Sequence, residues 1–180
     1  MKVKELKKEI VLINNILIDF EILLNHLKTN IIWDNSIVAR KTASFGIPYN
    51  YSNIHYDQNE IPNFLDELVK IVNSKNGFIP NNCLINFYFE NKSKMGFHSD
   101  QIDILDKNTG IVIFSFGSSR ILRFKSKNDS KMIYDILLEN NSYFYMSQNT
   151  QTEWLHSILP DKNIKESERF SLTFRKITEK

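Results

Sequence analysis

The sequence is poor in the features that mark secreted, membrane-spanning and repetitive proteins. Its single cysteine, Cys83, excludes an internal disulfide bond, and its apolar surroundings predict a small buried side chain. No stretch approaches the ~20 consecutive apolar residues of a membrane-spanning helix. The chain has 5 glycines and 4 prolines in 180 residues, without a linker, a repeat or a low-complexity tract. These absences favour a single globular domain.

The chain also lacks a strong net charge: 23 basic and 21 acidic residues leave a formal net charge of +2. A nearly neutral chain neither requires nor excludes a nucleic-acid partner, because a local basic patch is sufficient. The basic N-terminus is similar to the start of a signal peptide, but Glu5, Glu9 and Asp19 interrupt it, and no small-residue cleavage site follows. We therefore expect a cytoplasmic protein, a monomer without membrane association.

Apolar residues, 42% of the chain, are arranged in two different patterns. In the first third they recur at steps of three and four from Leu12 to Leu27, which predicts a helix, and a second helix is predicted over residues 62–72. After Cys83, runs rich in β-branched and aromatic residues predict strands at residues 84–89, 110–116, 121–124, 142–146 and 170–174. The order predicts an α+β fold in which a sandwich or jelly roll carries the site.

A candidate metal site begins with His98 and Asp100. Residues two apart in an extended strand point to the same side, so these side chains can reach one ion while Ser99 faces away. Of the other histidines, His156 lies in a strand-like run and is the best third ligand. Two histidines and one carboxylate suit non-haem iron(II) and leave positions open for a co-substrate and oxygen. A His-x-Asp pair taken alone is also common on protein surfaces.

A candidate anion site follows near the C-terminus. Residues 169–175 alternate strictly, with apolar residues on one strand face and Arg169, Ser171, Thr173 and Arg175 on the other. Two guanidinium groups and two hydroxyls match a small dicarboxylate, although an ordinary half-exposed strand has the same pattern. Asn86 and Tyr88, two residues apart, can add neutral hydrogen bonds.

Together these residues resemble the AlkB family of iron(II)/2-oxoglutarate oxygenases, from about Arg40 to Ile177. The matching segments, in family order, are residues 40–46, 49–52, 86–88, 98–100, 113–117, 154–157 and 169–175. Each motif alone is weakly specific, whereas the ordered set is specific.

The resemblance implies a double-stranded β-helix (jelly-roll) core, which we place at residues 81–180, and a nucleotide-recognition lid, which with the second helix occupies residues 36–80. The apolar periodicity adds a helical part at residues 1–35. It implies Fe(II) held by His98, Asp100 and His156. It further implies 2-oxoglutarate and O2 as co-substrates, and oxidative demethylation of alkylated bases in DNA or RNA, a DNA repair activity. The residues expected to hold 2-oxoglutarate are Asn86, Tyr88, Arg169, Ser171 and Arg175.

The sequence departs from the family at two positions. Ser171 stands where the last motif usually carries asparagine, and it keeps a hydrogen bond with a shorter side chain. Ile102 stands four positions after the first metal histidine, where repair members usually carry an acidic residue near the extruded base. The base preference of the family therefore does not transfer directly to this chain.

For the substrate, the resemblance places Tyr51 where the family stacks an aromatic ring on the extruded base. A basic run contains Arg120, Arg123, Lys125 and Lys127. Strand alternation puts its last three members on one side, where they can track phosphates or form a solvated face. We expect Tyr51, Arg120 and Arg123 to bind substrate.

Two other functions remain compatible with the sequence. A hydroxylase of a small molecule or a protein side chain would keep every co-substrate residue. A cupin-like zinc protein would explain His98, Asp100 and His156 but would leave the polar face of residues 169–175 without a purpose.

Overall fold

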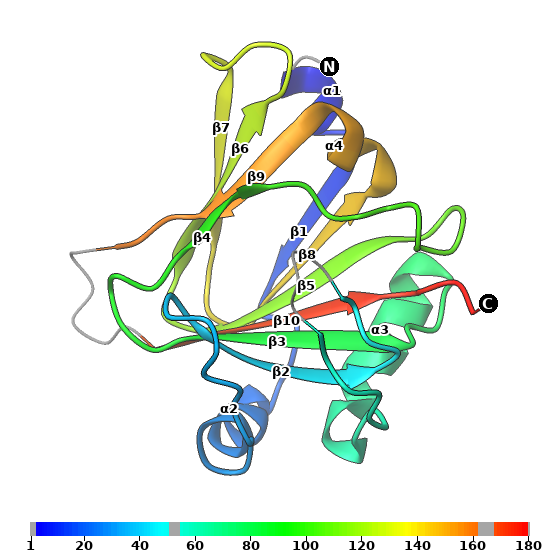
Figure 1. The fold of residues 1–180 in the computed structure, drawn as a ribbon, viewed down its shortest axis with the longest axis vertical. Coiled ribbons are helices and arrows are strands. Elements are labelled where there is room, and N and C mark those ends of the chain that lie inside the picture. Colours follow the sequence, from blue (N-terminus) through cyan, green and yellow to red (C-terminus); the bar gives the residue numbers. More distant parts are fainter. Residues whose placement is uncertain (1–2, 51–54, 162–167, 180) are drawn as a thin grey trace.

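The computed structural model describes residues 3–50, 55–161 and 168–179, which form two facing antiparallel sheets with helices outside one of them (Figure 1). The major sheet has six strands in the order β1-β8-β5-β10-β3-β2, and the minor sheet has four in the order β4-β9-β6-β7. Neighbours far apart in sequence, such as β3 and β10, pair directly along their whole lengths. This arrangement confirms the predicted jelly roll.

The strands have the following bounds. In the major sheet they are β1 (Ile10–Asn14), β2 (Lys41–Gly46), β3 (Asn82–Tyr88), β5 (Gly110–Gly117), β8 (Ser142–Ser147) and β10 (Arg169–Arg175). In the minor sheet they are β4 (Met95–His98), β6 (Arg120–Ser126), β7 (Ile133–Leu138) and β9 (Trp154–Ile158). The five predicted strands correspond to β3, β5, β6, β8 and β10.

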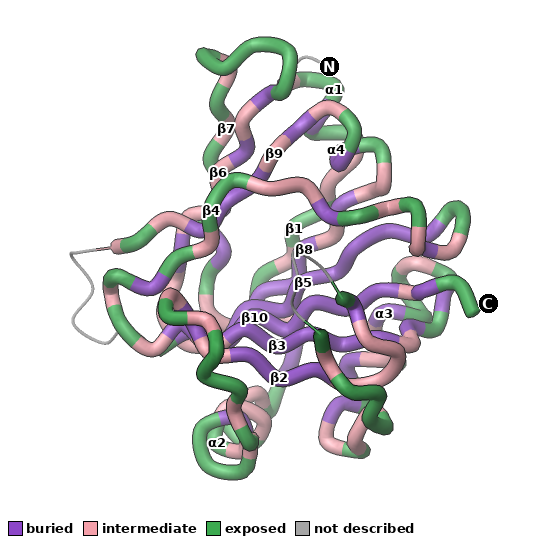
Figure 2. Tube along the Cα trace, in the orientation of Figure 1, coloured by how far each residue is buried: buried purple, intermediate pink, exposed green. Residues whose placement is uncertain are grey.

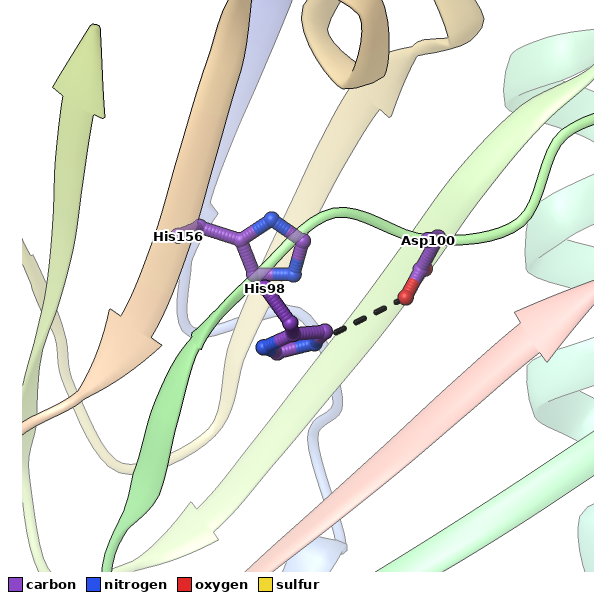
Figure 3. A group of neighbouring side chains, drawn as sticks. All are labelled: His98, Asp100 and His156. Atoms are coloured by element: carbon purple, nitrogen blue, oxygen red, sulfur yellow. Dashed lines mark ion pairs between the residues drawn. The ribbon is translucent and has the colours of Figure 1, made fainter. Parts of the chain in front are cut away.

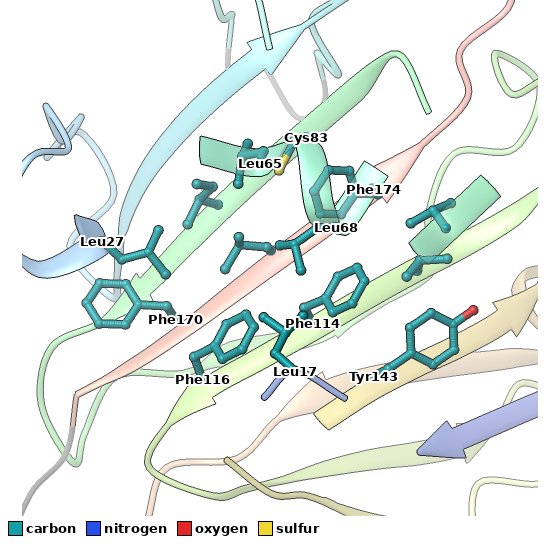
Figure 4. Close-up of a cluster of buried hydrophobic side chains, with 14 of the residues drawn as sticks. Leu17, Leu27, Leu65, Leu68, Cys83, Phe114, Phe116, Tyr143, Phe170 and Phe174 are labelled. Carbon is teal, nitrogen blue, oxygen red and sulfur yellow. The ribbon is translucent and has the colours of Figure 1, made fainter. Parts of the chain in front are cut away.

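The outer face of the major sheet is covered by α2 (Phe20–Thr29) and by the short 3-10 helix η1 (Asn63–Leu65), which leads into α3 (Asp66–Asn76). Leu27 and Leu68 from these helices join Phe114 and Phe174 from the sheet in one buried cluster (Figure 4). α3 ends at Gly77, which adopts the left-handed conformation that glycine tolerates best. Two shorter helices, α1 (Val3–Leu6) and α4 (Gln148–Glu153), complete the described elements. None of the described helices has the length and apolar character to cross a membrane.

A second buried cluster fills much of the space between the sheets. Ile111 and Phe144 from the major sheet meet Leu122, Phe124 and Trp154 from the minor sheet. The apolar packing leaves a polar gap at β3, β10, β4 and β9, where the site lies. The two sheets therefore enclose a cavity.

The N-terminal prediction was wrong in part. Residues 10–14 form strand β1, which pairs with β8 from Ile10 opposite Met146 to Asn14 opposite Ser142. Asn15 then adopts a φ of 55°, which interrupts any continuous helix. The helix begins only at Phe20, so sheet pairing overrides the local helical periodicity. The prediction for Cys83 is confirmed, since the side chain is fully buried and burial raises the pKa of its thiol.

Candidate active site

A cavity of about 540 Å³ lies between the two sheets. Its walls come from β3 and β10 on one side and from β4 and β9 on the other. Cavities of roughly 300–1,000 Å³ are typical of small-molecule sites. The space therefore suits a small co-substrate together with one reacting group.

His98, Asp100 and His156 meet at this cavity (Figure 3). His98 on β4 and His156 on β9 are paired directly across the two strands, so both rings project from the same face, with centroids 4.2 Å apart. Asp100 follows the end of β4 by two residues, and its Oδ1 lies 3.7 Å from His98 Nε2. The potential ligand atoms of all three lie within 4.8 Å of one another. The structure thus brings together the three predicted metal ligands.

Hydrogen bonding and burial prepare the two histidines to bind a cation. His98 Nδ1 lies 2.9 Å from the carbonyl oxygen of Gly96, so a proton on that nitrogen leaves the Nε2 lone pair facing Asp100. Burial, with a smaller contribution from the neighbouring His98, lowers the pKa of His156 to about 3. The His156 ring is therefore neutral over the whole ordinary pH range, which is the form that coordinates a metal.

Asp100 is held as a carboxylate from two sides. Arg175 donates from Nη2 and Nε to Asp100 Oδ2, at 2.9 and 3.3 Å. The Asp100 backbone N–H donates to Oε1 of the buried Gln151 at 2.8 Å, which fixes the loop after β4. Burial alone would raise the pKa of Asp100, but Arg175, His156 and His98 outweigh it, and the pKa lies below its usual range. Oδ1 thus remains directed at the histidines.

Arg169 supplies the feature best suited to an anion. Its side chain is 0% exposed, and its Nε donates to Ser115 Oγ at 2.9 Å. Within the part of the chain that the structure describes, neither Nη atom has a hydrogen-bond partner. A buried guanidinium whose Nη atoms lack acceptors is costly, and burial, partly offset by Tyr88, lowers the pKa of Arg169 to about 10. A carboxylate of a dicarboxylic acid would supply the missing acceptors.

Arg175 has a different environment from the one predicted. It pairs with Asp100, and its guanidinium carbon lies 4.0 Å from the centroid of the Tyr49 ring. The sequence argument assumed that both arginines needed an external counter-ion. Asp100 therefore acts as a counter-ion of Arg175 within the protein.

The other predicted co-substrate residues also line the cavity. Asn86, Tyr88 and Ser171 all face it, and Ser171 is paired across the sheet with Asn86. Asn86 Oδ1 accepts a hydrogen bond of 2.7 Å from Arg40 Nε. Arg40 and Gln151 were not assigned roles from the sequence. The signal for Arg40 was present, since it opens the first matching motif, whereas no local pattern distinguished Gln151.

Arg120 and Arg123, two of the three predicted substrate residues, do not line this cavity. Tyr51 lies outside the described residues. Arg120 is 1% exposed, and its Nη atoms donate to the backbone carbonyls of Glu90, Ser93 and Leu159. Its prediction as a substrate-binding residue was therefore wrong, because a buried arginine that ties three loop carbonyls together cannot reach a phosphate. Arg123 lies on the outer face of the minor sheet and forms two hydrogen bonds with Asp135, at 2.7 and 2.6 Å.

Comparison with known proteins identifies the family. A family model described as "2OG-Fe(II) oxygenase superfamily" matches residues 28–175. The chain belongs to this superfamily. The Fe(II) and 2-oxoglutarate of this superfamily are the cofactors expected from the sequence. The residues present fit both, because two histidines and one carboxylate suit the metal, and the buried Arg169 next to the cavity-lining Tyr88 suits a dicarboxylate.

Individual relatives confirm the resemblance to the AlkB family. The chain is 29% identical over 150 residues to "Alpha-ketoglutarate-dependent dioxygenase alkB homolog 3" of Rattus norvegicus, covering 77% of this chain and 50% of that protein. It is 29% identical over 151 residues to "DNA oxidative demethylase ALKBH2" of Homo sapiens, covering 78% and 57%. The chain thus spans about half the length of the curated relatives it matches. A solved structure titled "The structure of OsALKBH1" shares the fold, with a TM-score of 0.68 and 18% identity over 93% of this chain and 98% of that chain.

Proposed function

We propose that this protein is an iron(II)- and 2-oxoglutarate-dependent dioxygenase that oxidatively removes alkyl groups from bases in DNA or RNA. The observation that carries the proposal is the buried Arg169, whose Nη atoms lack acceptors among the described residues and whose guanidinium carbon lies 5.1 Å from the ring centroid of the cavity-lining Tyr88. A hydrolytic zinc site would leave this cation without a purpose. An oxygenase that binds a dicarboxylate explains the cation and the ligands together.

Bound iron(II) and 2-oxoglutarate supply an oxidant for a C–H bond, and 2-oxoglutarate is converted to succinate and carbon dioxide. The chain's own residues place these groups. His98, Asp100 and His156, which line the cavity, would hold the metal. Arg169 anchors a carboxylate, with Asn86 and Ser171 beside it. Apolar lining residues such as Ile113, Leu122 and Ile158 restrict water around the reacting groups.

Nucleic acid is the substrate class favoured by the surface beside the metal ligands. Lys127 Nζ donates to Oγ of Ser99, the residue between two of the ligands, at 3.1 Å. Lys125 Nζ lies 4.2 Å from the ring centroid of Phe97, which is 39% exposed and also borders the cavity. Two cations and an exposed aromatic ring at a cavity mouth suit a phosphate backbone and a displaced base. The human relative named "DNA oxidative demethylase ALKBH2" agrees with this assignment.

The test is a panel of methylated DNA and RNA oligonucleotides incubated with protein, iron(II), ascorbate and 2-oxoglutarate. We expect formaldehyde and the unmodified base, detected by mass spectrometry, and no product from Asp100→Ala, which removes a metal ligand. Asp106→Ala is the matched control, because it removes an exposed carboxylate that pairs only at the surface with Lys176. Succinate without formaldehyde from every oligonucleotide would reject nucleic acid and retain the oxygenase.

A second function, hydroxylation of a small molecule or a protein side chain, is favoured by the environment of the basic run that contains Arg120, Arg123, Lys125 and Lys127. Arg120 is buried, and the charge of Arg123 is balanced by Asp135, so only Lys125 and Lys127 remain near the site. The same panel separates the two functions, because this alternative yields no formaldehyde from any oligonucleotide.

A further inference from the structure

Asp100 differs from the two histidines of the metal-binding group in how its backbone is held. His98 and His156 lie opposite each other in the paired strands β4 and β9. Asp100 lies beyond His98, the last residue of β4, in a segment without regular secondary structure. A buried backbone N–H that has left a sheet needs another acceptor. The position of this ligand therefore depends on side chains from other parts of the chain.

Gln151 on helix α4 supplies the acceptor for Asp100. Its side chain belongs to a residue that is only 3% exposed, and its Oε1 accepts the Asp100 N–H at 2.8 Å. Helix α4 runs directly into strand β9, which carries His156. Strand pairing thus joins His98 to this segment, and the Gln151 amide joins Asp100 to it. One continuous segment, α4 with β9, positions all three ligands relative to one another.

A chain of hydrogen bonds fixes the orientation of the Gln151 amide. Its Nε2 donates to Thr150 Oγ1 at 2.8 Å, and Thr150 Oγ1 donates to the carbonyl oxygen of Ser147 at 2.7 Å. Because the hydroxyl hydrogen of Thr150 is used in that second bond, its oxygen can only accept from the amide. The amide therefore directs its own oxygen at the N–H of Asp100, and the consecutive bonds reinforce one another.

The residues directly before and after the metal-binding carboxylate are also held. Lys127 Nζ donates to the backbone oxygen of Gln151 at 2.7 Å and to Ser99 Oγ at 3.1 Å, so it joins α4 to the start of the same segment. The N–H of Gln101 donates to the hydroxyl oxygen of Tyr49 at 2.6 Å. Three consecutive residues after β4 thus have partners from distant parts of the chain.

We propose that Gln151 is a positioning residue of the metal centre, which holds Asp100 in its ligand position before the ion binds, and that Thr150 acts through Gln151. This inference rests on the metal site of the proposed function and is independent of its nucleic-acid substrate. A ligand that is already in place loses little conformational freedom when the ion arrives. The Gln151 side chain contacts the backbone of Asp100, so removing the amide leaves the carboxylate and its charge in the protein.

The experiment measures the cobalt(II) affinity of the metal-free protein by competition with a chelating dye, and its readout does not depend on turnover. Gln151→Met keeps the length of the side chain and removes the amide. Partners that orient metal ligands typically contribute about tenfold to a hundredfold in metal affinity, and we expect a loss of this size. Urea denaturation without metal gives the stability of each variant, so a loss of fold is separated from a loss of positioning.

Gln148→Met is the matched control, because it makes the same substitution on the same helix. Gln148 is half-buried, and its Nε2 donates to the carbonyl oxygen of Asp106, which is not a member of the metal-binding group. We expect this variant to lose stability and to keep its cobalt(II) affinity. A folded Gln151→Met with unchanged affinity, or equal losses of affinity in the two variants, would overturn the inference.

A second pair of variants tests the role of Thr150. Thr150→Val removes the hydroxyl that holds the Gln151 amide, whereas Thr150→Ser keeps it, so we expect weaker cobalt(II) binding in the first and restored binding in the second. If Gln151→Met does not fold, this pair decides, and equal affinities of the two Thr150 variants would overturn the inference. Failure of the unaltered protein to bind cobalt(II) at all would instead reject the metal site, and with it the proposed function.

Discussion

The two faces of strand β10 are equally buried and chemically opposite. Figure 2 shows the strand buried along its length, in agreement with the burial of all seven residues. Toward the helices, Phe170, Leu172 and Phe174 pack into an apolar cluster. Toward the minor sheet, the opposite face carries Arg169, Ser171, Thr173 and Arg175. Burial therefore does not distinguish core from site, whereas the partners of the polar atoms do.

The partners of the polar atoms also distinguish two buried arginines. Arg120 and Arg169 are 1% and 0% exposed, and both lie at the start of a strand. The Arg120 Nη atoms reach three backbone carbonyls, whereas those of Arg169 reach no acceptor among the described residues. One guanidinium is part of the framework, and the other is prepared for a ligand.

The largest difference in stability should appear between two neighbours on β10. Phe174→Ala opens a void in the apolar cluster and should cost about 3–5 kcal/mol of unfolding free energy. Thr173→Ala alters a wall that already borders a cavity, so it should cost no more than about 1 kcal/mol. Urea denaturation of both variants measures the difference. Equal losses would mean that the cavity face is packed as tightly as the core.

A smaller effect should appear in the pH dependence of the stability of the metal-free protein. Since burial lowers the pKa of His156 from 6.5 to about 3, the unfolded chain binds the proton first as the pH falls. Stability should therefore decline as the pH decreases from about 6.5 toward 3. In His156→Gln the decline over this window should be shallower, while the exposed His55→Gln should keep it. Thermal melts at a series of pH values test this, and identical slopes in all three proteins would contradict the neutral, buried imidazole.

Much of this contrast could be predicted from the sequence. The alternation of residues 169–175 predicted both faces of β10, and the two-residue spacing of His98 and Asp100 predicted ligands on one side. His156 required only the observation that it lies in a strand-like run. The periodicity of the apolar residues and the spacing of the candidate ligands were therefore enough to predict the fold class and the metal-binding residues.

The rest depends on contacts between distant segments. The pairing of Asp100 with Arg175 joins residues 75 apart, and the bond of Arg40 to Asn86 joins residues 46 apart. Arg120 looked like a surface cation in the sequence because the loop carbonyls that accept its hydrogen bonds are distant along the chain. Residues 10–14 looked helical because their pairing with β8 leaves no local pattern. In each case a tertiary partner determines the role of the residue.

The central claim is that the donors of Arg169 are kept for 2-oxoglutarate, and calorimetric titration tests it most directly. Iron(II)-loaded protein, handled without oxygen, is titrated with 2-oxoglutarate as the unaltered chain and as Arg169→Ala and Arg120→Ala. Charge-assisted bonds contribute about 1.5–3 kcal/mol each, so Arg169→Ala should weaken binding by about tenfold to a hundredfold or more. Its unfolding free energy without ligand should change little, because a buried cation with few acceptors is itself unfavourable. Arg120→Ala should lose stability and keep its affinity wherever it remains folded. Unchanged 2-oxoglutarate affinity in a folded Arg169→Ala would contradict the account.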